Sequence, residues 1–215
     1  MIRSVFRLLA AAALVAPLAA QATLYDFTAT LKGSNEVPGN AVTASTAGTG
    51  FGSLQYNDAG TPGILSDDSI FVLLAAANLT GPATDWHIHG AATTTESAGV
   101  RVNLKALLSG TPGGGAGTGT LAMGGLILAS ASPSSFSFGV TGATATNAGH
   151  PAMSLLAMLQ SGLGYFNVHT AASTSGEIRG QLVQVTPVPE PGTYAMLAAG
   201  LLVVGAVARR RQAKT

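Results

Sequence analysis

The sequence predicts an all-β fold, a single β-sandwich or Greek-key barrel with one short helix, flanked by a hydrophobic helix at each end. Many short apolar runs alternate with turns rich in Gly, Pro and Ser, which is typical of such folds. Only 9% of the residues are charged and there is no cysteine, so the hydrophobic core alone must hold the fold together. The body, residues 23–187, is long enough for one domain.

Residues 1–22 have the order of a signal peptide. Two arginines come first, an apolar run covers residues 8–18, and Ala20 and Ala22 give the small-x-small pattern that signal peptidase reads. The apolar run is too short for a permanent transmembrane helix. We therefore predict an N-terminal signal helix, cleavage by signal peptidase, and a mature chain that begins near Thr23.

Residues 188–215 form a second targeting segment. A Pro-Glu-Pro motif in residues 188–192 precedes a hydrophobic helix over 193–208 and a basic end over 209–215. The apolar part of this helix spans about 22 Å, slightly less than a hydrocarbon core of about 30 Å. We expect it to act as a short transmembrane helix with its arginines on the cytoplasmic side. The expected sorting residues are Pro189, Glu190, Pro191, Arg209, Arg210 and Arg211.

This tail resembles the PEP-CTERM sorting signal in its motif, its apolar helix and its basic cluster, which occur in that order. The resemblance implies recognition of residues 189–191 by an exosortase-type membrane protease, in a Gram-negative host that makes extracellular polysaccharide. It also implies export across the inner membrane and a transient membrane anchor. The mature protein would then reach the cell surface or the medium.

The charge of the body excludes nucleic-acid binding. The whole chain has a formal net charge of +1, but six of its ten basic residues lie in the two targeting segments. Residues 23–187 keep four basic residues against eight acidic ones, a net charge of −4. A mildly acidic body has no basic stripe that could follow a phosphate backbone.

Apolar runs bounded by turn residues place the strands and the helix. The expected strands cover residues 24–31, 51–56, 69–79, 85–89, 99–104, 119–129, 135–141, 165–170 and 177–185. The run 69–79 is long and apolar, so we expect it to be buried. Residues 151–160 have helical apolar spacing, Pro at the start and Gly162 beyond the end, which predicts a short helix on the sheet edge.

Two similar segments, residues 87–104 and 167–182, suggest a duplicated hairpin. Each has a histidine after an aliphatic residue, a turn rich in Thr or Ser, and an arginine on the outgoing strand. Because side chains alternate between the faces of a strand, polar residues share one face and aliphatic residues the other. The residues expected on the polar faces are His87, His89, Asn167, His169, Glu177, Arg179 and Gln181.

Four stretches, residues 35–38, 86–90, 165–170 and 176–182, together resemble the chordin-type (CHRD) domain. The resemblance extends over about residues 24–185 with its motifs in order. It implies a β-rich extracellular module and no defining catalytic activity.

The histidines suggest a metal site. His87 and His89 lie on one strand face about 7 Å apart at Cα, and His169 could add a third imidazole. An oxygen of Glu177 or Asp85 could complete a Zn or Cu shell. The His-x-His strand motif is similar to that of copper–zinc superoxide dismutases, whose other ligands have no match in this sequence.

The alternative is a structural polar network. In that case the histidines satisfy backbone groups, Glu177 pairs with Arg101 or Arg179, and Asn167 completes the network. Two functions therefore stay open. The first is a non-enzymatic surface or matrix protein associated with exopolysaccharide, and the second is a secreted metal-binding or redox protein.

Overall fold

The computed structural model describes residues 22–37, 47–61, 64–108, 119–128, 149–150, 152–185, 198–202, 204 and 209–210. The chain divides into two compact units, Met1–Val185 and Thr186–Thr215, which we describe separately. The signal segment up to residue 21, the expected strand 135–141 and the Pro-Glu-Pro motif lie outside the described residues.

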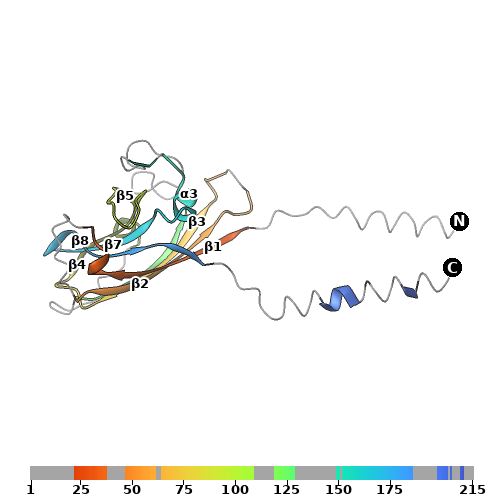
Figure 1. Ribbon diagram of the computed structural model, residues 1–215, viewed down its shortest axis with the longest axis horizontal. Helices are drawn as coiled ribbons and strands as arrows, with labels where there is room; N and C mark the ends of the chain where they lie inside the picture. The colour runs from red at the N-terminus through yellow and green to blue at the C-terminus, as the bar shows by residue number, and fades with distance from the viewer. Residues whose placement is uncertain are drawn as a thin grey trace. The chain divides into compact units, whose positions relative to one another are not determined.

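The described part of the first unit contains nine strands in one antiparallel sheet, which confirms the all-β prediction (Figure 1). The strands are β1 (Leu24–Lys32), β2 (Thr49–Asn57), β3 (Ser69–Ala77), β4 (Ala83–His89), β5 (Val100–Asn103), β6 (Leu121–Leu128), β7 (Tyr165–Thr170), β8 (Ser173–Gln181) and β9 (Val183–Val185). Their order in the sheet is β5-β4-β7-β8-β1-β2-β3-β6, and β9 pairs with β1.

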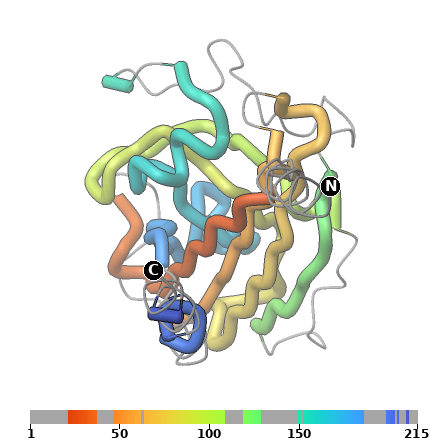
Figure 2. The backbone as a smooth tube through the Cα atoms, turned by 90° about the vertical axis from the view of Figure 1, so that its right-hand side faces the viewer, coloured from red at the N-terminus to blue at the C-terminus, as the bar shows by residue number. Residues whose placement is uncertain are grey.

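The sheet curls around a common core (Figure 2). β2 and β7 are three places apart in the strand order, yet they meet across the core. A Cβ atom placed on Gly52 of β2 would lie 2.5 Å from the ring of Phe166 in β7. Gly52 therefore gives the Phe166 ring room to pack, and this close approach requires a curled sheet.

The strand period places one face of each strand in the core. In β1 the inward residues Phe27, Ala29 and Leu31 are buried, while their neighbours are half-buried or exposed. β3 also alternates, and its outward residues Phe71 and Leu73 are 43% and 48% exposed. The expectation of a fully buried strand over residues 69–79 was therefore wrong, because only one face of β3 packs into the core.

The short helices are set by side-chain caps. α3 (Leu155–Gln160) confirms the expected helix, and it starts after Ser154 because the Ser154 hydroxyl accepts a hydrogen bond from Ala157 N. A second helix, α2 (Leu104–Leu107), was not predicted; the Asn103 side chain caps it by accepting from Ala106 N. A 3₁₀ turn, η1 (Gly33–Asn35), follows β1.

In the second unit, residues 198–202, 204 and 209–210 are helical, and Arg209 and Arg210 are exposed. No helix within the described residues is long and apolar enough to cross a membrane. Most of the expected helix over 193–208, together with Arg211, lies outside the described residues.

Gly52→Ala tests the contact across the core. The added methyl group must displace the Phe166 ring, and overpacking of this kind costs about 1–3 kcal/mol of unfolding free energy. Gly81→Ala is the matched control, because a Cβ at Gly81 meets nothing within 4 Å. Urea denaturation followed by circular dichroism measures both variants. Equal stability of the two variants would contradict the curled arrangement.

Candidate metal centre

The two hairpins predicted from the repeated segments lie side by side in the sheet as β4–β5 and β7–β8 (Figure 1). Their incoming strands β4 and β7 pair antiparallel, with Asp85 opposite His169 and His87 opposite Asn167. The register shifts between Ala83 and Asp85 in this ladder. Such irregularities re-aim side chains next to functional sites.

The pairing brings His87, His89 and His169 together, as the sequence suggested. All three are buried, and one ring nitrogen from each lies within 4.8 Å of the others. The ring centroid of His87 is 5.3 Å from that of His89 and 5.1 Å from that of His169. The apolar residues on the opposite face of this strand, Trp86 and Ile88, lie in the core.

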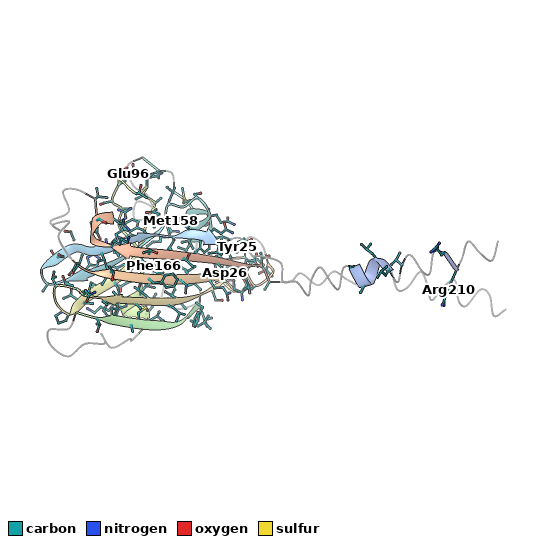
Figure 3. All side chains as sticks on the ribbon, turned by 60° about the horizontal axis from the view of Figure 1, so that its bottom comes forward. Tyr25, Asp26, Glu96, Met158, Phe166 and Arg210 are labelled. Carbon is teal, nitrogen blue, oxygen red and sulfur yellow. The ribbon has the colours of Figure 1, made fainter. Side chains whose placement is uncertain are left out.

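The loop between β4 and β5, residues 90–99, covers the polar face of β7 and β8. Arg179 donates to the carbonyl oxygens of Thr93 and Glu96, at 2.7 and 2.6 Å. Gln181 donates to the carbonyl of Ala92. The polar face predicted from the sequence is therefore covered by this loop, in which Figure 3 labels Glu96.

Each histidine of the triad uses one ring nitrogen to contact an oxygen acceptor. His87 Nε2 lies 3.0 Å from Asp85 Oδ1, His89 Nδ1 lies 2.9 Å from the carbonyl of Ala98, and His169 Nδ1 lies 3.0 Å from that of Thr174. A carbonyl or ionised carboxylate oxygen can only accept a hydrogen bond, so each of these nitrogens carries the proton. The assignment fixes one tautomer for each neutral ring.

The remaining nitrogens offer lone pairs, and those of His87 and His169 face each other. His87 Nδ1 and His169 Nε2 are 3.3 Å apart, and neither has a proton to share in these tautomers. His89 Nε2 is buried and has no hydrogen-bond partner among the residues that the structure describes. Two ligands of a tetrahedral zinc ion with Zn–N of about 2.05 Å are about 3.3 Å apart. The donor set therefore fits a metal ion.

Burial disfavours protonation of the three histidine rings. Burial lowers the pKa of His87 from 6.5 to about 4, although Asp85 acts in the opposite direction. Burial also lowers the pKa of His89, to about 3, and the pKa of His169. At neutral pH the three rings are neutral, which is the form that binds metal ions.

A stack of side chains holds His89 from behind. The Tyr165 ring stacks on His89, with 5.2 Å between centroids and 17° between planes. The Arg179 guanidinium lies over the Tyr165 ring, 3.5 Å from its centroid. Tyr165 also accepts a hydrogen bond from Ala98 N at its hydroxyl. Sequence analysis missed Tyr165 as part of the site, although side-chain alternation along a strand puts residues 165 and 169 on the same face.

Glu177, which the sequence suggested as a metal ligand, bonds two threonines instead. Its carboxylate accepts hydrogen bonds from Thr80 N at 2.8 Å and from the hydroxyls of Thr80 and Thr170 at 2.6 Å. It thereby ties the loop after β3 to β7 and β8. Asp85, the other oxygen that the sequence offered, reaches the centre through His87 Nε2.

The residues expected in a polar network are buried on the same side of the sheet. Arg101 donates to the carbonyl of Met153, and Arg179 holds the covering loop. Asn167 is 2% exposed and packs against Gly176, where a Cβ would lie 2.4 Å from its Oδ1. The hydrogen bonds of Arg101 and Arg179 to backbone carbonyls therefore coexist with the histidine cluster.

A polar cavity of about 400 Å³ lies beside this network. Asn35 and Glu36, from the first stretch of the CHRD resemblance, line it together with Arg179 and Gln181. His150 lies outside the triad and contacts the Glu96 carboxylate at 2.8 Å.

The lowered pKa values of the histidines predict acid sensitivity. Below about pH 6.5 the unfolded chain binds protons that the buried rings exclude, so stability falls as the pH falls toward about 4. A loss on the order of 2 kcal/mol lowers the melting temperature by about 4–8 °C. Thermal unfolding in EDTA between pH 7 and pH 5 measures the effect. His89→Gln should flatten the profile and His150→Gln should not; a flat wild-type profile would refute the assignment.

Comparison with known families agrees with this architecture. Residues 27–182 match the family model of the CHRD domain, and residues 187–212 match that of the PEP-CTERM protein-sorting motif. Searches of curated proteins and of solved structures return no match. The sorting motif marks the chain for export and for processing at the membrane by an exosortase, a membrane protease. Both resemblances read from the sequence are confirmed.

The CHRD match begins in β1 and ends just after β8, so it contains the complete histidine cluster and the loop that covers it. It extends over more than half of the chain. The protein belongs to the CHRD domain family and carries a PEP-CTERM sorting motif.

Proposed function

We propose that this exported protein binds one Zn or Cu ion between His87, His89 and His169. The observation that carries the proposal is the close approach of three buried imidazole rings, each of which has one nitrogen that donates to an oxygen and one that offers a lone pair. Imidazole nitrogens suit Zn and Cu, and three of them leave a coordination position open for water or another ligand.

The surrounding residues would prepare the triad for a metal ion. Asp85 and the carbonyls of Ala98 and Thr174 hold the three outer N–H groups, which keeps the inner nitrogens unprotonated. The Asp85 carboxylate also supplies a negative charge near an incoming cation. A bound zinc ion would supply a Lewis acid, and copper would add one-electron redox chemistry.

The purely structural network explains the buried N–H groups but leaves the inner nitrogens facing one another. His87 Nδ1 could donate to His169 Nε2 only if His87 Nε2 gave up its proton. That nitrogen would then present a lone pair to the Asp85 carboxylate 3.0 Å away. A metal ion removes this conflict, and therefore the geometry favours the metal-binding alternative.

The sorting motif supports a second part of the proposal. We infer that the protein is a non-enzymatic surface or matrix protein that is retained with exopolysaccharide after processing. The body is acidic and the described face of β3 exposes Phe71 and Leu73, which are surface properties compatible with an extracellular assembly.

Metal analysis tests the first part. The full-length protein, loaded with Zn or Cu and then dialysed, should retain about one ion per chain by mass spectrometry. His87→Ala and His169→Ala should weaken binding at least 100-fold, and Asp85→Ala, which frees the His87 ring, by about 10–100-fold. His150→Ala removes a histidine outside the triad and should retain the ion. Sub-stoichiometric metal in the wild type, or an equal loss in His150→Ala, would refute the site.

Processing of the tail tests the delivery route. Glu190→Ala, within the Pro-Glu-Pro motif, should accumulate an unprocessed form in the membrane fraction. Gln184→Ala changes an exposed residue just before the motif and should leave processing intact. Cell fractionation and immunoblotting measure both variants. Normal release of the Glu190→Ala protein would show that the motif does not direct processing.

A further inference from the structure

The start of β1 is bound to a carboxylate at the end of β2. Thr23 N donates to Asp58 Oδ1 at 2.7 Å, and Asp58 N donates back to the carbonyl of Thr23 at 3.2 Å. The neighbouring pair Leu24 and Asn57 is the first of the β1–β2 ladder. The contact between Thr23 and Asp58 therefore closes this ladder.

Asp58 is built into the fold. It is 8% exposed, and its Oδ1 also accepts a hydrogen bond from Gly60 N at 2.9 Å. These backbone donors lower the pKa of Asp58, so its carboxylate is ionised at neutral pH. The Asp58 carboxylate is therefore already ionised and held in place in the uncleaved chain.

The surroundings of Asp58 are negative. Asp67 and Asp68 lie nearby. Burial raises the pKa of Asp68, and the charges of Asp67 and Asp58 raise it further. Tyr56 donates its hydroxyl to Asp68, and Tyr25 packs edge-on against Tyr56. Within the described part of the chain, no lysine or arginine forms an ion pair with these three carboxylates. A positive charge at this place would relieve their mutual repulsion.

We propose that Asp58 is a binding site for the α-ammonium group created at Thr23 when the signal peptide is removed. Hydrolysis of the bond between Ala22 and Thr23 adds OH to the Ala22 carbonyl carbon and H to Thr23 N. The new amine takes a further proton from water at neutral pH. The atom that donates an amide N–H in the precursor thus becomes a cation in the mature chain.

The exchange strengthens a contact that already exists. Hydrogen bonds between two charged groups are shorter and stronger than those with a neutral donor. The β1–β2 end of the sheet is then less stable in the precursor than in the mature protein. Cleavage acts as a covalent step that tightens the fold after export.

The pKa of the Thr23 amine tests the proposal. Mature protein isolated after export is first checked by mass spectrometry for an N-terminus at Thr23. Its amine is then titrated by pH-dependent acetylation with peptide mapping. The pKa of this amine should lie above its usual range of roughly 7.7–8.0. The stabilisation by the contact between the amine and Asp58 is then present below that range and is lost as the pH rises through the raised pKa.

Two variants of equal charge change provide the control. Asp58→Asn keeps an oxygen that can accept the Thr23 hydrogen bond but removes the charge, so the fold is retained and the amine pKa should return to its usual range. Asp67→Asn removes an exposed charge that bonds Thr61 instead, and should leave most of the shift. An ordinary amine pKa in the wild type, an equal shift in both variants, or a mature N-terminus elsewhere would overturn the proposal.

Discussion

The antiparallel pairing of β4 with β7 is the interaction on which the rest of the domain depends. It joins two hairpins that lie far apart in the sequence, and its register sets Asp85 opposite His169 and His87 opposite Asn167. On one face, Trp86, Ile88 and Val168 enter the core. On the other face the histidines converge. A slip of one residue would turn both sets to the wrong side.

The polar groups on the buried second face need hydrogen-bond partners, and the covering loop provides them. A buried guanidinium is costly unless its N–H groups find acceptors. The loop over residues 90–99 offers Arg179 two carbonyls, while the Tyr165 ring offers it a π face. The same loop offers His89 the carbonyl of Ala98. The loop thus stabilises the arginine and orients the imidazole with one stretch of backbone.

Short apolar runs separated by turns were sufficient to predict the fold class. The histidine triad needed two signals, because alternation places His87 and His89 on one face and the repeated segment adds His169. These signals were not sufficient for contacts made by loops. Glu177 bonds Thr80, and no local pattern indicates which loop comes close to β8. The helix α2 depends on the Asn103 cap, and the sequence analysis included Asn103 in the expected strand over residues 99–104. In β3 the apolar run suggested burial, but chain topology leaves Phe71 exposed.

The triad is a long-range structure. His87 and His169 are 82 positions apart, so no segment shorter than about half of the domain can assemble the three nitrogens. Contacts of such high sequence separation form late, because the intervening chain must first lose its conformational freedom. An unfolded chain therefore does not present the complete set of three histidines. Under the proposed function, the triad would therefore first meet the ions of the compartment where folding finishes, rather than those of the compartment where the chain is made.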